Sequence, residues 1–219
     1  MAETIAILGG TGDLGTGLAI RWSKVGHKII IGSRTLEKAQ AAVAALQQIS
    51  PETPADAMVN ADAAAAGDIV VLTVPAEHQL STLDGVKASL QGKILIDVTV
   101  PLVPPKVGTV QLPAEGSAGK RAQDLLGDDV MVVTAFQNIA AHLLQEDVAI
   151  ECDVLVAGNK KAARDKVIEL AGQAGMNGYH AGPIENSAAA EALTSILIQI
   201  NRRHDISHSG IKIVGQADH

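Results

Sequence analysis

Short apolar runs rich in β-branched residues alternate with alanine-rich stretches of helical periodicity along this chain. The runs predict seven strands, the third within 58–68 and the others at 4–8, 28–32, 69–74, 93–97, 130–135 and 152–158. A short helix is expected after the third strand, and longer helices at 12–25, 35–49, 76–90, 160–175 and 186–203. Strands that are apolar on both faces need helices on both sides. The pattern therefore predicts an α/β fold with a doubly wound, mostly parallel sheet.

The segment 98–120 interrupts this alternation. It contains four of the chain's eight prolines, and because proline cannot donate to a β-ladder we predict an irregular loop. A loop of this length inside a compact domain is usually functional. A domain boundary is expected near residue 140. Beyond it, the strand at 152–158 either belongs to a small C-terminal substrate-binding portion or joins the same sheet.

A glycine-rich turn lies between the first predicted strand and the first predicted helix. It reads Gly10-Thr11-Gly12-Asp13-Leu14-Gly15 and matches the dinucleotide fingerprint G-x-G-x-x-G of Rossmann-type folds in its proper context. Gly10 permits the tight turn, Gly12 lets the backbone approach a pyrophosphate, and Gly15 lets the helix pack closely on the strand. The helix N-terminus then offers free N–H groups to the phosphates. A glycine-rich turn without a ligand is the alternative.

The end of the second predicted strand indicates which dinucleotide binds. NAD-binding domains usually carry an acidic residue there for the ribose 2′-hydroxyl, whereas this chain reads "IIIGSRTLEKA". Ser33 and Arg34 replace the acid, and Lys38 follows one helical turn later. A guanidinium can grip a 2′-phosphate with two parallel hydrogen bonds, so NADP(H) is the predicted cofactor. The alternative is that Arg34 is only a solvated residue at a helix start.

Residues 73–78, "TVPAEH", follow the fourth predicted strand at the edge where such sheets bind ligands. Thr73, Val74 and Pro75 are expected beside the nicotinamide ribose, and His78 is either a cofactor contact or an ordinary surface or core histidine. The Tyr-x-x-x-Lys pair of short-chain dehydrogenases, a zinc motif and a G-x-S-x-G elbow are all absent from the sequence. We therefore predict a nucleotide site with no catalytic acid or base and no metal.

Composition narrows the range of partners. The net charge is −7 and aromatic residues make up 1% of the chain, so neither phosphate tracking nor base stacking has the residues it needs and nucleic acid is not expected. No apolar run approaches a membrane span, and the start of the chain lacks the basic segment of a secretory signal. A soluble cytoplasmic protein is expected. A single cysteine, Cys152, excludes an internal disulfide and is expected to be buried at a strand.

The last predicted helix carries a wide apolar stripe. The stripe comprises Ala188, Ala192, Leu193, Ile196, Leu197 and Ile200, and Ala189, Ala190 and Ile198 widen it. We expect it to be buried, either against the nucleotide domain or across a two-fold homodimer interface.

Five segments together resemble one family, the NADPH-dependent reductases of coenzyme F420, also called F420-dependent NADP oxidoreductases. They are "ILGGTGDLGTGLA", "IGSRTLEKA", "LTVPAEH", "DVTVPLVPPKVGTVQLPAEGSAGKRAQDLLG" and "AGPIENSAAAEALTSILIQINRR". The proline-rich segment and the final helix are the most specific, because ordinary Rossmann proteins lack them. The resemblance implies reversible hydride transfer between NADP(H) and the deazaflavin F420.

The resemblance also implies which residues bind each cofactor. The glycine turn with Ser33, Arg34 and Lys38 would bind NADP(H) within residues 1–140, and residues 141–219 would close the F420 cleft. The residues facing the deazaflavin would be Val98, Thr99, Val100, Pro101, Leu102, Gln137, Asn138 and Ile139. The family often carries histidine where this chain has Gln137, so glutamine either imitates its hydrogen bond or alters the contact.

Two other functions stay open from the residues themselves. One is a non-enzymatic NADP-binding redox sensor whose last helix binds a partner. The other is an NADPH-dependent reductase of an imine, a flavin or a ferric chelate, since related nucleotide domains serve those reactions.

Overall fold

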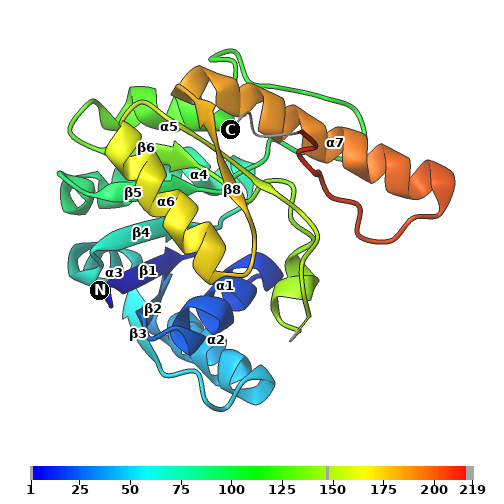
Figure 1. Cartoon of the computed structure of the whole chain (residues 1–219). Coiled ribbons are helices and arrows are strands. Elements are labelled where there is room, and N and C mark those ends of the chain that lie inside the picture. The colour runs from blue at the N-terminus through cyan, green and yellow to red at the C-terminus, as the bar shows by residue number, and fades with distance from the viewer. Residues whose placement is uncertain (1, 147, 216–219) are drawn as a thin grey trace.

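An eight-stranded sheet forms the centre of the computed structural model, which describes residues 2–146 and 148–215 (Figure 1). The strands lie side by side in the order β3-β2-β1-β4-β5-β6-β7-β8. Strands β1 to β6 are parallel, β7 is antiparallel to β6, and β8 is parallel to β7. Their bounds are Thr4–Leu8, Lys28–Ser33, Ala55–Val59, Ile69–Leu72, Ile94–Asp97, Met131–Thr134, Val154–Gly158 and Gly178–Gly182. The predicted doubly wound, mostly parallel sheet is thus confirmed.

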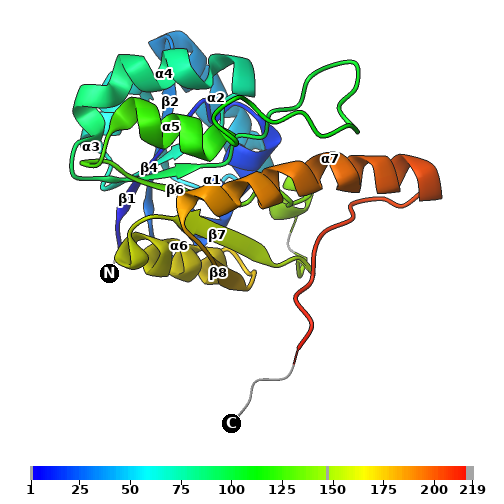
Figure 2. The ribbon, with the colours of Figure 1, turned by 90° about the horizontal axis from the view of Figure 1, so that it is seen from above.

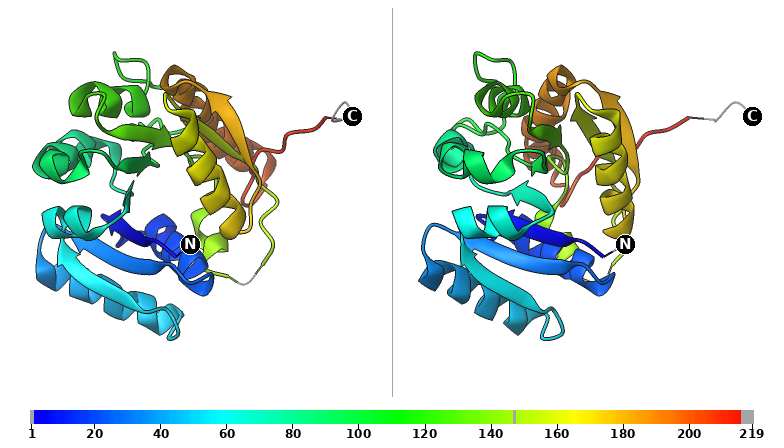
Figure 3. Two further views of the ribbon diagram at one scale, coloured as in Figure 1. Left: turned by 60° about the vertical axis from the view of Figure 1, so that its left-hand side comes forward. Right: turned by 90° about the vertical axis from the view of Figure 1, so that its left-hand side faces the viewer.

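Helices cover both faces of the sheet (Figure 3). The α-helices α1 to α7 span Asp13–Lys24, Leu36–Ile49, Asn60–Ala66, Gln79–Val86, Ala118–Leu126, Lys161–Gln173 and Ser187–His204. Short 3-10 helices η1 to η4 span Ala76–His78, Lys87–Leu90, Ala141–Leu144 and Ile184–Asn186. Helices α1, α2 and α6 pack on one face, and α3, α4 and α5 on the other.

Alternation along β1 explains the two hydrophobic cores. Ile5 and Ile7 belong to the core under α1, α2 and α6, whereas Ala6 and Leu8 belong to the core under α3, α4 and α5. Successive side chains of a strand point to opposite faces, so a central strand must be apolar throughout. The continuous apolar runs noted in the sequence are therefore the signature of this double burial.

The predicted elements differ from the observed ones in several places. The third strand, expected within 58–68, spans Ala55–Val59 and so begins before that segment. The strand expected over 69–74 ends at Leu72, and the helix expected over 76–90 is divided into η1, α4 and η2. The irregular segment ends at Ser117, because α5 begins at Ala118 with its N–H groups capped. Strand β8 was not predicted. It lies at the edge of the sheet, where its sequence GYHAG is half-buried or exposed and shows no apolar run.

Strand β7 joins the same sheet, which was one of the two possibilities left open by the sequence. It pairs with β6 through Val133–Gly158 and Thr134–Ala157, so its earlier residues extend past the end of β6. Cys152 is buried directly before this strand, as predicted. The connection from β6 to β7 passes over α1, where the Arg21 guanidinium donates to the carbonyl oxygens of residues 143, 144, 146 and 148.

Helix α7 extends away from the sheet (Figure 2). It packs on the rest of the chain through Ser187, Ala190, Glu191 and Ser195, which are buried. Within the chain only Ala190 of the apolar stripe is buried, and Ile196 remains 45% exposed, so burial of the stripe across a homodimer interface stays a prediction. The physical reason for this limited burial is that α7 meets α5 and the 137–138 segment, whose backbone groups and Asn138 side-chain amide form hydrogen bonds with α7. No helix in the described part of the chain is long and apolar enough to cross a membrane.

Candidate functional site

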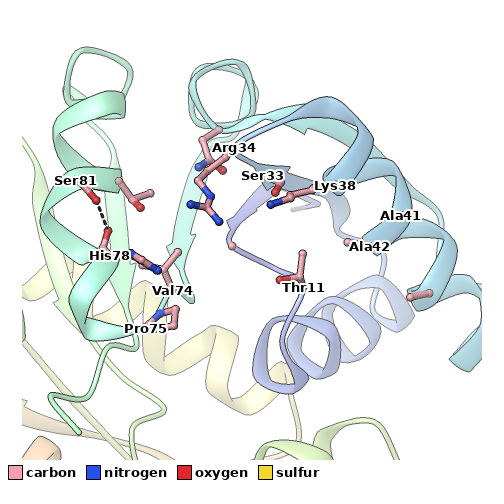
Figure 4. Close-up of a pocket in the computed structure, with 14 residues that line it drawn as sticks. Thr11, Ser33, Arg34, Lys38, Ala41, Ala42, Val74, Pro75, His78 and Ser81 are labelled. Atoms are coloured by element: carbon pink, nitrogen blue, oxygen red, sulfur yellow. Dashed lines mark hydrogen bonds between the residues drawn. The ribbon is translucent and has the colours of Figure 1, made fainter. Parts of the chain in front are cut away.

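The strand order of the sheet reverses between β1 and β4, which places a topological switch point at their carboxyl ends. A cavity of about 570 Å³ opens there (Figure 4). It brings together seven residues predicted from the sequence: Thr11, Ser33, Arg34, Lys38, Val74, Pro75 and His78. Seven further lining residues were not predicted, namely Gly9, Ala41, Ala42, Ala45, Asn60, Ser81 and Thr82. Only Gly9 had a sequence signal, because it precedes the fingerprint in the same turn.

The glycine turn has the geometry that the fingerprint predicts. A Cβ at Gly10 would lie 3.1 Å from Ile7 Cγ2, and one at Gly15 would lie 2.8 Å from the Gly10 Cα. A Cβ at Gly12 would meet nothing within 4 Å. Gly10 and Gly15 therefore allow close packing of α1 on β1, whereas Gly12 leaves open space in front of the helix N-terminus. That N-terminus has no side-chain cap, so its N–H groups remain available to an anion.

Positive charge gathers at the end of β2. Ser33 ends the strand, Arg34 follows it, and Lys38 lies in the first turn of α2, which Thr35 caps through a hydrogen bond accepted from the Lys38 N–H. The Arg34 and Lys38 side chains are exposed and reach into the same part of the cavity (Figure 4). Two cations and a hydroxyl at this position match the size and charge of a phosphate group.

The opposite wall is formed by Val74, Pro75 and His78, which follow β4. Thr73 does not line the cavity, because its hydroxyl donates to the Leu8 carbonyl oxygen at 3.0 Å and ties the end of β4 to β1. Five other predicted residues also lie outside the cavity lining, namely Gly10, Gly12, Asp13, Leu14 and Gly15. The Asp13 carbonyl oxygen accepts a hydrogen bond from Gln145 Nε2 at 3.2 Å, and Leu14 packs against the core.

A second, smaller cavity of about 220 Å³ lies where the segment after β6 meets α7. It brings together the predicted residues Gln137, Asn138 and Ile139 with residues of α7 and of the chain that follows it. Asn138 Nδ2 donates to the Ala190 carbonyl oxygen at 2.8 Å, and the Thr194 hydroxyl donates to the Gln137 carbonyl oxygen at 2.9 Å. One turn of α7 therefore sets the position of the 137–138 segment. The α7 residues were missed because the sequence does not indicate which helix faces this segment.

Residues 98–102, at the start of the proline-rich segment, line neither cavity but lie close to Gln137 of the smaller one. Val98 and Thr99 are buried, and Val100, Pro101 and Leu102 are half-buried. The Thr99 N–H donates to the Asp97 carboxylate at 2.9 Å, and Gln137 Nε2 donates to the Asp97 carbonyl oxygen at 3.0 Å. Asp97 thus connects this segment to Gln137. Burial raises the pKa of the Asp97 carboxyl, although hydrogen bonds from Thr99 and Gln79 oppose that effect.

Comparison with known proteins shows to which family this chain belongs. Residues 4–101 match the family model described as NADP oxidoreductase coenzyme F420-dependent. The F420-dependent NADP reductase of Methanocaldococcus jannaschii is 40% identical over 95% of this chain and 97% of its own. That of Methanothermobacter thermautotrophicus is 38% identical over 97% of this chain and 95% of its own. The chain belongs to the F420-dependent NADP reductase family. The predicted resemblance is confirmed.

A solved structure supports the same relationship. A candidate F420-dependent NADP reductase from Arthrobacter sp. FB24 superposes on this family member with a TM-score of 0.82, covering 98% of this chain and 100% of that chain at 26% identity. The match extends through β7, β8 and α7, so the C-terminal part of the fold is shared as well.

Proposed function

We propose that this protein transfers a hydride reversibly between NADP(H) and coenzyme F420. The observation that carries the proposal is the 40% identity to an F420-dependent NADP reductase over nearly the whole of both chains. The site chemistry agrees with it, since the cationic side chains of Arg34 and Lys38 line the larger cavity where a 2′-phosphate would bind. Neither cavity is lined by a buried acid or base.

We assign NADP(H) to the cavity at the switch point. Ser33, Arg34 and Lys38 would hold the 2′-phosphate, and the free N–H groups at Gly12 would meet the pyrophosphate. Val74 and Pro75 would lie against the nicotinamide half, with His78 at the exposed rim. The open space in front of Gly12 supports this assignment, because a bound phosphate needs room that a Cβ would take.

We assign the deazaflavin to the region of Gln137, Asn138, Ile139 and residues 98–102, so that residues 141–219 close the acceptor side and residues 1–140 carry the nucleotide. The Gln137 Oε1 atom is buried and has no hydrogen-bonding partner among the residues that the structure describes. A buried acceptor of this kind is costly unless a ligand or water donates to it. The N–H on the pyrimidine edge of a deazaflavin is a suitable donor, so these residues fit the cofactor.

The protein's part in the reaction is orientation and exclusion of water. Bound NADPH supplies the hydride, and bound F420 accepts it at a ring carbon. Val74, Pro75 and Ile139 present apolar surface to planar rings, and the hydrogen bonds of Asn138 and Thr194 hold the acceptor side in place. Holding two reactants in a near-contact geometry supplies much of the acceleration of such a transfer, so no side-chain proton relay is required.

Purified protein, NADPH and F420 mixed in one cuvette test the proposal. We expect loss of F420 absorbance that depends on both the protein and NADPH. If NADPH binds but F420 is not reduced, the proposed function is wrong. Parallel assays with an imine, a flavin and a ferric chelate then identify a reductase of another acceptor, and failure of all four leaves the redox sensor.

We propose that α7 also forms a two-fold homodimer interface. Its stripe residues Leu193, Leu197 and Ile200 are only half-buried within the chain, and Ile196 is exposed. A contiguous apolar face of this kind favours association with a second copy, and two-fold dimers are the most common soluble oligomers. Light scattering at micromolar concentration should give twice the mass of the chain, and Ile196→Asp should give the monomer. A monomeric wild-type protein would refute the interface.

A further inference from the structure

Helix α7 carries one buried acidic side chain, Glu191, for which hydride transfer has no direct use. It is 1% exposed and accepts two backbone hydrogen bonds, from the Ala118 N–H at 2.7 Å and from the Gly119 N–H at 3.0 Å. These are the first two N–H groups of α5, a helix of nine residues. A carboxylate at this position satisfies two donors that the helix itself leaves unpaired and matches the positive end of its dipole.

Two further contacts show that α5 and α7 are closely fitted here. The Ser187 hydroxyl, one turn before Glu191, donates to the Ser117 hydroxyl at 2.7 Å, and Ser117 in turn caps the Lys120 N–H. A Cβ at Gly119 would lie 2.2 Å from Thr134 Cγ2 and 3.0 Å from the Ser187 hydroxyl oxygen. Only glycine lets the first turn of α5 approach α7 and β6 this closely. The hydrogen bonds of Glu191 are thus part of a close contact in which α5 and α7 have little room to move against each other.

The same turn of α7 holds the acceptor side. Ala190 and Thr194 flank Glu191 in the helix, and both bind the 137–138 segment, through Asn138 Nδ2 and the Gln137 carbonyl oxygen. A shift of α7 against α5 would therefore move these two attachment points together.

The first turn of α5 is also tied to the nucleotide side. Gln79 Nε2 donates to the Ala118 carbonyl oxygen at 2.9 Å and to the Asp97 carboxylate at 2.5 Å. Arg121 donates to Gln79 Oε1 at 2.6 Å and to the Ala76 carbonyl oxygen in η1 at 3.3 Å. Ala76 directly follows Pro75, which lines the larger cavity. The contact between Glu191 and α5 is thus one link in a hydrogen-bonded chain that joins η1 to Asn138.

We propose that Glu191 is a positioning residue of the acceptor site, whose carboxyl group clamps α7 to α5 and thereby fixes Gln137 and Asn138 for binding of the deazaflavin. The proposal rests on the assignment of F420 to this region. Ionisation changes this contact in two opposing ways. A carboxylate can accept from both N–H groups, whereas a protonated carboxyl directs its own O–H at one of them and loses that bond, but a buried charge is itself costly.

The surroundings of Glu191 bring its titration near neutral pH. Burial raises the pKa of Glu191 to about 7, the two backbone N–H groups oppose this effect, and the Asp97 carboxylate adds to it. Two cations of α5 lie nearby, but Arg121 is bound to Gln79 and Lys120 is paired with Asp124. The hydrogen bond to Asp124 raises the pKa of the Lys120 ammonium, and Glu185 of η4 and Glu115 add to this effect. Strand β7 contacts α7 and consists of apolar residues and glycine, so it brings no charged side chain to this helix.

Nuclear magnetic resonance of the protein without cofactors tests the clamp directly. Between about pH 5.5 and pH 8.5 the backbone amides of Ala118 and Gly119 and the side-chain amide of Asn138 should shift with one shared midpoint near the pKa of Glu191. The shared inflection should disappear in Glu191→Gln and persist in the matched control Glu185→Gln. If the Asn138 amide does not follow Ala118 and Gly119, the clamp does not reach the acceptor site and the proposal is overturned.

Kinetics supply the second measurement. We expect Glu191→Gln to raise the KM for F420 by about tenfold above pH 7, as the loss of one charge-assisted hydrogen bond implies, with an unchanged Kd for NADPH. Any ionisation of F420 itself affects both proteins equally and cancels in their ratio. A wild-type KM and pH profile in Glu191→Gln would also overturn the proposal. If the wild type does not reduce F420, the proposed function fails, while the cofactor-free resonance experiment still tests the clamp. Should Glu191→Gln not fold, the wild-type resonance titration decides alone.

Discussion

Arg34 is the residue that we expect to determine the choice of cofactor. Its exposed guanidinium and the Lys38 ammonium reach into the cavity at the end of β2, where an NAD-specific domain would place an acid. Arg34→Ala should weaken NADPH binding by about 1.5 to 3 kcal/mol, because a charge-assisted pair with the 2′-phosphate is lost. NADH binding should change little. Calorimetry with both nucleotides checks this, and equal losses would mean that Arg34 supports the fold instead.

Substitution of the histidines that line the two cavities tests whether a side chain transfers a proton in the reaction. His78 lines the larger cavity and His142 the smaller one, yet neither is buried. Direct hydride transfer needs no proton relay, so His78→Ala and His142→Ala should each lower kcat by much less than the 10²–10⁴-fold that removal of a general acid or base causes. A loss of that size in either variant would show that proton transfer limits the reaction.

At the scale of the element, the glycine turn contains one glycine that packing requires, Gly15, and one that we expect cofactor binding to require, Gly12. Gly15→Ala places a Cβ 2.8 Å from the Gly10 backbone, whereas Gly12→Ala places one in open space. We expect Gly15→Ala to lower the free energy of unfolding by about 1–3 kcal/mol, as overpacking does. Gly12→Ala should change it by less than about 1 kcal/mol but weaken NADPH binding at least tenfold. Urea denaturation and nucleotide titration of both variants provide the check. Reversed effects would contradict the assigned roles.

At the scale of the whole molecule, Glu191 makes stability depend on pH. Its pKa is raised from 4.5 in the unfolded chain to about 7 in the fold, so between these values the folded state binds more protons. The contribution of Glu191 to the free energy of unfolding is therefore fully present below the pKa of the unfolded chain and is lost as pH rises through about 7. The loss from this group approaches about 3 kcal/mol, at 1.36 kcal/mol for each pKa unit.

The Asp97 carboxyl, whose pKa burial also raises, contributes in the same direction. The Glu191 share is isolated by comparing the wild type with Glu191→Gln, whose thermal unfolding midpoint should fall less steeply between about pH 5 and pH 8. Parallel curves for the two proteins would show that Glu191 does not titrate in this range.

Direct contact between the two cofactors would also depend on the whole molecule. The residues that follow β4 and those that follow β6 would have to hold the nicotinamide and the deazaflavin against each other. If the rings stack directly, deuterium from the correct face of NADPH C4 should appear at C5 of reduced F420. It should remain there in ordinary water, since a C–H bond does not exchange. Mass spectrometry after a single turnover measures this. Loss of the label to solvent would exclude direct transfer.

Several features could be predicted from the sequence because they depend on neighbouring residues. The strands β1, β2 and β5 and the helices α1, α2 and α6 follow from local periodicity, and the fingerprint at residues 10–15 follows from fixed spacing. The replacement of an acid by Ser33 and Arg34 is likewise local, since one turn and one strand end build that part of the cavity. The continuous apolar runs required helices on both faces of the sheet, whatever the details of packing.

Only the tertiary structure decided what depends on residues far apart in the chain. The polar edge strand β8 has no apolar run, and its place follows from pairing with β7. The amphipathic pattern of α7 predicted burial of its apolar stripe. Within the chain, α7 buries Glu191 and Ser187, because the unpaired N–H groups of α5, more than 60 residues earlier, need acceptors. Such long-range hydrogen bonds leave no period or spacing in the sequence, so the clamp at Glu191 became visible only when the two helices met.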